Sequence, residues 1–250
     1  MVLCRNMSEG REPEAVVYPG APLRAVAIEV TFPALLDAVS RFGAFQRRHF
    51  ADFDRLYEAS GDDEDVVPDG REFSRPRSTV LMGREPRERA VTIARDQLAV
   101  ITYTYSTGFA GFAKWAMPML REGLGDLAVE RVKRVSFRYE NRIPHDTRKL
   151  DLGSLLRFSI PAPAEAGAFQ HVHQYWHQKW PDGIVRVEID ACPYVSGDEI
   201  HLNITAEHQA RSGSLDDIEP LLREAHRRAR LTFEELITPP FRDRLRTGRN

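Results

Sequence analysis

The stretch Val135-Ser136-Phe137-Arg138-Tyr139-Glu140-Asn141-Arg142-Ile143 is the most informative part of this chain for the fold. Its residues alternate between apolar and polar up to Tyr139, so Val135, Phe137 and Tyr139 share one face of a predicted strand. A polar turn and then Pro144 follow the strand. The pattern predicts a strand with one buried face.

Strands and helices alternate along the part of the chain that leads to this stretch. Elements are predicted as strand, helix, strand, strand, strand and helix, at residues 23–32, 34–59, 79–82, 90–94, 97–105 and 109–124. The first helix is expected to be interrupted near Gly43. Residues 60–77 are acidic and rich in Gly, Asp and Pro, which predicts a loop. The order resembles a ferredoxin-like sheet with both helices on one face.

The second half of the chain predicts more strands and one long helix. Strands are expected at residues 155–160, 168–180, 183–192 and 199–207, and a helix follows at residues 215–237. Ser214 is the expected N-cap of this helix. The fold class is therefore α+β, a mostly antiparallel sheet with long amphipathic helices on one face. We expect a flexible tail at 1–17 and α+β units at 18–150 and 151–250, either packed together or forming one continuous domain.

Composition limits the function classes. The chain has 250 residues, 42% hydrophobic and 29% charged, with a net charge of −2. This balance argues against nucleic-acid binding through bulk electrostatics. Cys4 and Cys192 do not make a disulfide framework, and no apolar run is long enough to cross a membrane. We expect a cytoplasmic protein without a membrane partner.

Two motifs resemble those of a known family. They are Pro22-Leu23-x-x-Val26-x-x-Glu29-Val30 and Arg138-Tyr139-x-Asn141-Arg142-Ile143. Together they resemble a sporadically distributed bacterial protein family of unassigned function. The resemblance implies a bacterial α+β protein, and a sporadic distribution suits an accessory or defence-associated role. It carries over no catalytic residue.

A histidine-rich strand is the candidate metal site. His171 and His173 would point to the same side of the strand at 168–180, the spacing of many paired metal ligands. His201 or Asp190, from later strands, would complete the site. The competing interpretation is a polar contact surface with no metal or other cofactor, and the sequence favours it.

The candidate binding residues lie at two places. Arg138 and Arg142, with Tyr139 and Asn141, could grip a phosphate or carboxylate, although a structural role at the strand end is favoured. Another set, Tyr175 and Trp176, belongs to the histidine-rich strand and suits contact with a ligand or a protein.

These observations favour a non-catalytic binding protein. No phosphate-binding loop, Cys-x-x-Cys pair or His-Glu-x-x-His helix occurs in the sequence. The expected partner is another bacterial protein, and a small-molecule ligand is the further option. The alternatives are a metal-dependent enzyme that uses the histidine cluster, and weak nucleic-acid binding through helical arginines such as Arg223 and Arg227.

Overall fold

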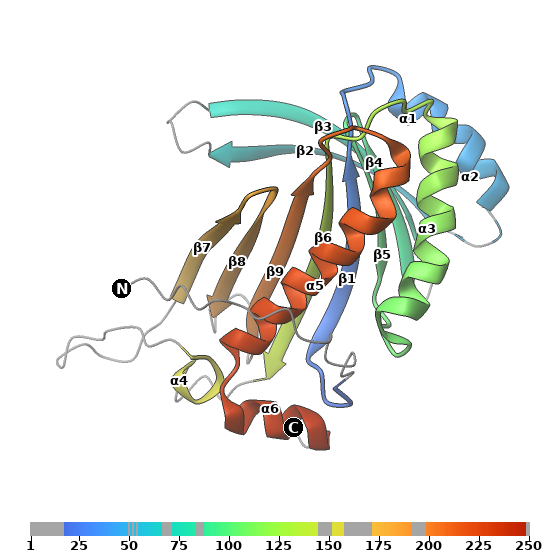
Figure 1. Ribbon diagram of the computed structural model, residues 1–250. Coiled ribbons are helices and arrows are strands. Elements are labelled where there is room, and N and C mark those ends of the chain that lie inside the picture. Colours follow the sequence, from blue (N-terminus) through green and yellow to red (C-terminus); the bar gives the residue numbers. More distant parts are fainter. Residues whose placement is uncertain are drawn as a thin grey trace.

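A computed structural model describes residues 18–49, 51, 53, 55–66, 72–83, 88–144, 152–157, 172–191 and 199–248. In this part of the chain, nine strands form one antiparallel sheet in the order β2-β3-β4-β5-β1-β6-β9-β8-β7 (Figure 1). The strands are β1 (Leu23–Thr31), β2 (Arg55–Val66), β3 (Glu72–Gly83), β4 (Arg89–Ala94), β5 (Gln97–Thr102), β6 (Arg134–Pro144), β7 (Val172–Trp180), β8 (Gly183–Ala191) and β9 (Glu199–Gln209). The helices are α1 (Ala38–Arg41), α2 (Gly43–His49), α3 (Gly108–Asp126), α4 (Leu152–Leu155), α5 (Ile218–Leu236) and α6 (Pro239–Thr247), with a short 3-10 turn at Leu215–Asp217. The α+β fold class is confirmed.

The first half has the expected ferredoxin-like strand order. β1 lies between β5 and β6, and β4 pairs with the other edge of β5. The chain passes from β5 through α3 to β6, so α3 connects two strands that are not neighbours. The hairpin β2–β3 is an addition to this pattern, inserted between α2 and β4.

The second half extends the same sheet. β7, β8 and β9 pair in sequence, and β9 then pairs with β6 along the whole stretch Arg134–Pro144. The helix α5 returns across the sheet and lies over β6 and β9 on the face that α3 also covers (Figure 1). Strands from 18–150 and from 151–250 therefore share one sheet.

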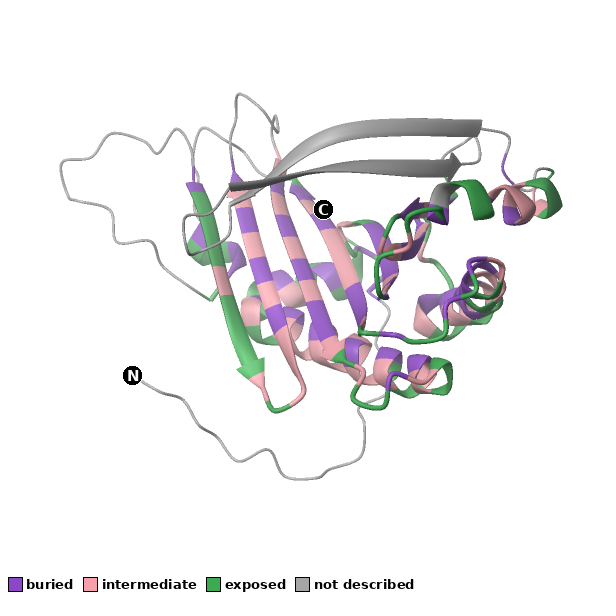
Figure 2. Cartoon of the chain, turned by 90° about the horizontal axis from the view of Figure 1, so that it is seen from above, coloured by how far each residue is buried: buried purple, intermediate pink, exposed green. Residues whose placement is uncertain are grey.

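Successive side chains of β6 point to opposite faces of the sheet, so every second residue lies under the helices. Phe137 lies opposite Ala206 of β9, and Tyr139 lies opposite Ile204. Phe137, Ala206 and Ile204 are fully buried. The same alternation appears in Figure 2 as bands of buried and intermediate residues along β6, β9 and β8, whereas β7 at the sheet edge is mostly exposed.

The face of β6, β9 and β8 opposite the helices is polar. Glu207 is buried on this face: its side chain is only 7% exposed and accepts a hydrogen bond from Arg134 at 2.9 Å. Arg186 of β8 binds the other carboxylate oxygen. These ion pairs join three neighbouring strands, which satisfies a carboxylate that would otherwise be costly to bury.

The expected helix at 34–59 is wrong beyond His49. The interruption at Gly43 is confirmed, because α1 ends at Arg41 and α2 begins at Gly43. The chain then turns, with the Phe53 amide bonded to the His49 carbonyl, and Phe53 enters the core from this turn. The apolar residues after His49 keep a helical spacing, but spacing alone does not show whether Phe53 belongs to a longer helix or to a turn.

Two other expected elements are also wrong. The predicted loop at 60–77 contains the paired strands β2 and β3, and their register places Asp63 opposite Arg75. The sequence around these two residues lacks the hydrophobic alternation from which strands are predicted. In place of the predicted strand at 155–160, the short helix α4 ends at Leu155, and Leu156 forms an isolated bridge with Ile237. Residues 158–160 and the expected tail at 1–17 lie outside the described residues.

Candidate ligand pocket

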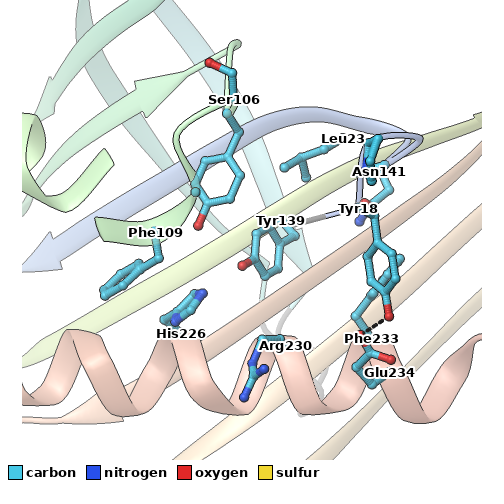
Figure 3. Close-up of a pocket in the computed structure, with 14 residues that line it drawn as sticks. Tyr18, Leu23, Ser106, Phe109, Tyr139, Asn141, His226, Arg230, Phe233 and Glu234 are labelled. Atoms are coloured by element: carbon cyan, nitrogen blue, oxygen red, sulfur yellow. Dashed lines mark hydrogen bonds between the residues drawn. The ribbon is translucent and has the colours of Figure 1, made fainter. Parts of the chain in front are cut away.

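A pocket is lined by residues of β1, β6, α5 and the start of α3 (Figure 3). Its volume is about 410 Å³, which is in the range of small-molecule sites. Four segments that are far apart in the sequence form its walls. The lining residues are Tyr18, Pro19, Ala21, Leu23, Tyr105, Ser106, Gly108, Phe109, Tyr139, Asn141, His226, Arg230, Phe233 and Glu234.

The helices are placed by their small and apolar residues. On α5, Ala225 and Ala229 are fully buried and let this helix approach the sheet closely, while His226 and Phe233 reach the pocket. On α3, Gly108 at the first position has a φ of 64°, a left-handed conformation that glycine adopts without strain. The chain there turns so that Tyr105 and Phe109 both line the pocket.

Aromatic rings surround the imidazole of His226. Phe109 stacks on it with ring centroids 4.0 Å apart and an interplanar angle of 8°. Phe137 meets it edge-on at 5.0 Å, and Tyr139 lies at 6.2 Å. Burial lowers the pKa of His226 from 6.5 to about 4, and the positive charge of Arg230 acts in the same direction. His226 is therefore neutral at pH 7.

The hydroxyls of Tyr105 and Tyr139 are the next polar groups of the pocket. The Tyr105 hydroxyl is buried without a hydrogen-bond partner among the described residues. The hydroxyl of Tyr139 is near enough to raise the pKa of Tyr105, which burial already holds far above its usual range, but the two do not meet with hydrogen-bond geometry. Burial raises the pKa of Tyr139 itself to about 12. Both phenols are therefore neutral at pH 7.

The rim of the pocket carries a bonded carboxylate. Tyr18 donates a hydrogen bond to Glu234, which also pairs with Arg242 at 2.9 Å (Figure 3). Burial, and next the bond to Glu234, raise the pKa of Tyr18 to about 12. The turn that carries Tyr18 is fixed to α6, because the Gly20 amide donates to the Leu245 carbonyl at 3.0 Å.

The predicted binding residues are separated by the sheet. Tyr139 and Asn141 line the pocket, and the Asn141 amide donates to the Leu202 carbonyl at 3.0 Å. The neighbouring residues Arg138 and Arg142 belong to the opposite face, since successive strand residues alternate. Arg138 pairs with Glu140 at 3.2 Å.

The other predicted groups lie on the polar face and at the edge. Arg142 contacts His201 at 2.5 Å and pairs with Glu199 at 3.7 Å. Tyr175 and Trp176 belong to the edge strand β7, where Tyr175 is 55% exposed.

The predicted metal ligands lie in one row across the polar face. The register places His173 opposite Asp190, and Asp190 opposite His201, on the neighbouring strands β7, β8 and β9. His173 and Asp190 are 3.4 Å apart. Among the described residues, no group of three or more His, Cys, Asp or Glu side chains is arranged to hold a metal ion. His171 and Cys192 lie outside these residues.

The helical arginines considered for nucleic-acid binding are ion-paired. Arg223 pairs with Glu219 at 2.8 Å, and Arg227 and Arg228 both pair with Glu224, at 2.6 and 2.7 Å. This is the salt-bridged helix surface that their spacing indicates.

Sequence reasoning missed most of the pocket. Tyr18, Tyr105, His226 and Phe233 were not recognised as a site, because four distant segments must meet to form it. One signal was present: His226 follows the buried Ala225 and belongs to the apolar stripe of α5. A histidine on the buried side of an amphipathic helix is a candidate for a functional group.

No protein-family model matches the chain, and no curated protein matches it. In the described part of the chain, no helix is long and apolar enough to cross a membrane.

Proposed function

We propose that this protein is a non-catalytic binding protein that holds a small organic ligand in the pocket between α3, α5 and β6. The observation that carries the proposal is the neutral imidazole of His226 within a wall of aromatic rings. Among the described residues, no hydrogen bond to its ring nitrogens is found, and His226 lines the pocket. Pockets with mostly apolar walls and a few polar groups are the usual form of ligand sites.

Indole is a suitable first probe, because it is flat, aromatic and soluble. We expect saturable binding with a dissociation constant of about 0.1 mM, which is typical of an efficient ligand of this size. Protein-observed NMR titration would measure it. Ala21→Trp places a large ring at the exposed rim of the pocket, and we expect it to weaken binding by at least about tenfold, or 1.4 kcal/mol.

The matched control is Ala34→Trp, an exposed alanine that follows the opposite end of β1. This variant should bind indole as the wild type does. No saturable binding at millimolar indole, or equal binding by both variants, would contradict the proposed function.

A protein partner at β7 is the second candidate. β7 is an edge strand with β8 as its neighbour in the sheet of the described residues, and it carries the exposed Tyr175. Edge strands can add an extended segment of another protein to the sheet. We infer that an accessory partner would bind there.

Co-purification from the native host tests this second candidate. Tyr175→Lys adds a charge to the β7 surface and should remove the partner. Leu36→Lys, at a side chain that is 86% exposed outside the sheet, should retain it. Recovery of no partner, or the same partner with both variants, would count against docking at β7.

A further inference from the structure

Three polar groups of the pocket, the hydroxyls of Tyr105 and Tyr139 and the imidazole of His226, are neutral and lack a well-formed hydrogen bond to the described residues. The Tyr105 hydroxyl is buried without a hydrogen bond, and neither the Tyr139 hydroxyl nor the His226 imidazole is hydrogen-bonded to a described residue with good geometry. The Tyr139 hydroxyl is turned toward His226, and Phe109 covers the far face of the imidazole (Figure 3). A phenol can donate and accept, and a neutral imidazole has one donor and one acceptor nitrogen.

Two charged residues, Arg230 and Glu234, also line the pocket. Glu234 is already bonded to Tyr18 and Arg242. The side chain of Arg230 runs along α5 away from Tyr139 (Figure 3). The wall formed by Phe109, Tyr139 and His226 therefore offers flat apolar surfaces and uncharged hydrogen-bonding groups.

We propose that the pocket selects a flat, uncharged heteroaromatic ligand whose ring edge carries both an N–H donor and a carbonyl acceptor, as in a lactam. This inference rests on the proposed function, since it names the class of ligand for the same site. The ring lies against Phe109 and Tyr139, and its polar edge satisfies the phenol and imidazole groups. A site that leaves such groups unpaired with the wrong ligand discriminates strongly against that ligand.

Three bicyclic probes of nearly equal size test the ligand class. Isoquinolin-1(2H)-one carries the lactam edge, naphthalene has no polar group, and 1-naphthoate carries a negative charge. We expect isoquinolin-1(2H)-one to bind about tenfold or more tightly than either of the other two, because one good hydrogen bond is sufficient for that factor. Naphthalene or 1-naphthoate binding equally well or better would overturn the inference.

Two variants test which groups form hydrogen bonds with the polar edge of the ligand. His226→Phe keeps the stacked ring and removes its nitrogens, so affinity for the lactam should fall about tenfold while affinity for naphthalene does not fall. Tyr105→Phe should also weaken lactam binding. The same variant should raise the melting temperature of the unliganded protein by about 2 °C, because it removes an unpaired buried hydroxyl. Tyr175→Phe, on exposed β7, should change none of these values.

The outcomes separate this inference from the proposed function. If indole and naphthalene bind as well as the lactam, and the two variants leave the order of affinities unchanged, the pocket is a binding site but the ligand class is wrong. If none of the probes binds, the proposed function itself fails, and the inference fails with it.

Discussion

Phe137→Ala is expected to lower the free energy of unfolding by about 4 kcal/mol, the usual cost of removing a large ring from a close-packed core. Phe137 is fully buried in the middle of β6. Its ring lies 5.7 Å from that of Phe109 on α3 and 5.0 Å from that of His226 on α5. The ring therefore joins both helices to the sheet, and its loss leaves a cavity between three elements.

Urea unfolding followed by circular dichroism measures this change. Tyr175→Ala provides the control, because its aromatic side chain is 55% exposed on β7 and contributes little to the core. We expect an almost unchanged unfolding midpoint for that variant. A loss below about 1.5 kcal/mol for Phe137→Ala would mean that the site collapses freely and that the ring does not fix the helices.

Stability should fall in mild acid because of His226. Burial keeps the pKa of this group near 4 in the folded protein, against 6.5 ordinarily. Between these values the unfolded chain binds more protons than the folded chain does, so the contribution of His226 is complete above pH 6.5 and is lost as the pH falls toward 4. We expect a loss of about 2 kcal/mol between pH 7.5 and pH 4.5 from this group, after allowance for its partial exposure.

His226→Gln isolates that contribution. Its free energy of unfolding should fall less with acid than that of the wild type, by the same amount of about 2 kcal/mol, because the other titrating groups are shared. Urea unfolding at several pH values measures both curves. Parallel curves for the two proteins would contradict the buried neutral imidazole.

The sheet could be predicted where alternation is strong. Residues 135–143 gave β6 and the burial of Phe137, and the strands β8 and β9 lie within about two residues of their predicted bounds. The β2–β3 hairpin could not be predicted, because its sequence around Asp63 and Arg75 consists of charged and small residues without hydrophobic alternation. Periodic hydrophobicity contains no information about such a pair.

The pocket could be predicted only in part. Tyr139 and Asn141 were selected because they end a strand, yet some of their partners, such as His226, come from segments more than 80 residues away. The alternation of β6 also separates Tyr139 from Arg138 and Arg142, which were grouped with it by proximity in the sequence. The pocket could not be recognised because its residues are far apart in the sequence. The predicted group of Arg138, Tyr139, Asn141 and Arg142 is split between the two faces of the sheet.

A crystal structure of the protein soaked with isoquinolin-1(2H)-one tests the central claim most directly. We expect one probe molecule in the pocket, its ring against Tyr139 and Phe109, with a polar atom about 3 Å from the His226 imidazole or a tyrosine hydroxyl. An empty pocket at a saturating concentration of the probe, or a probe bound elsewhere on the molecule, would contradict the claim that this cavity is a ligand site.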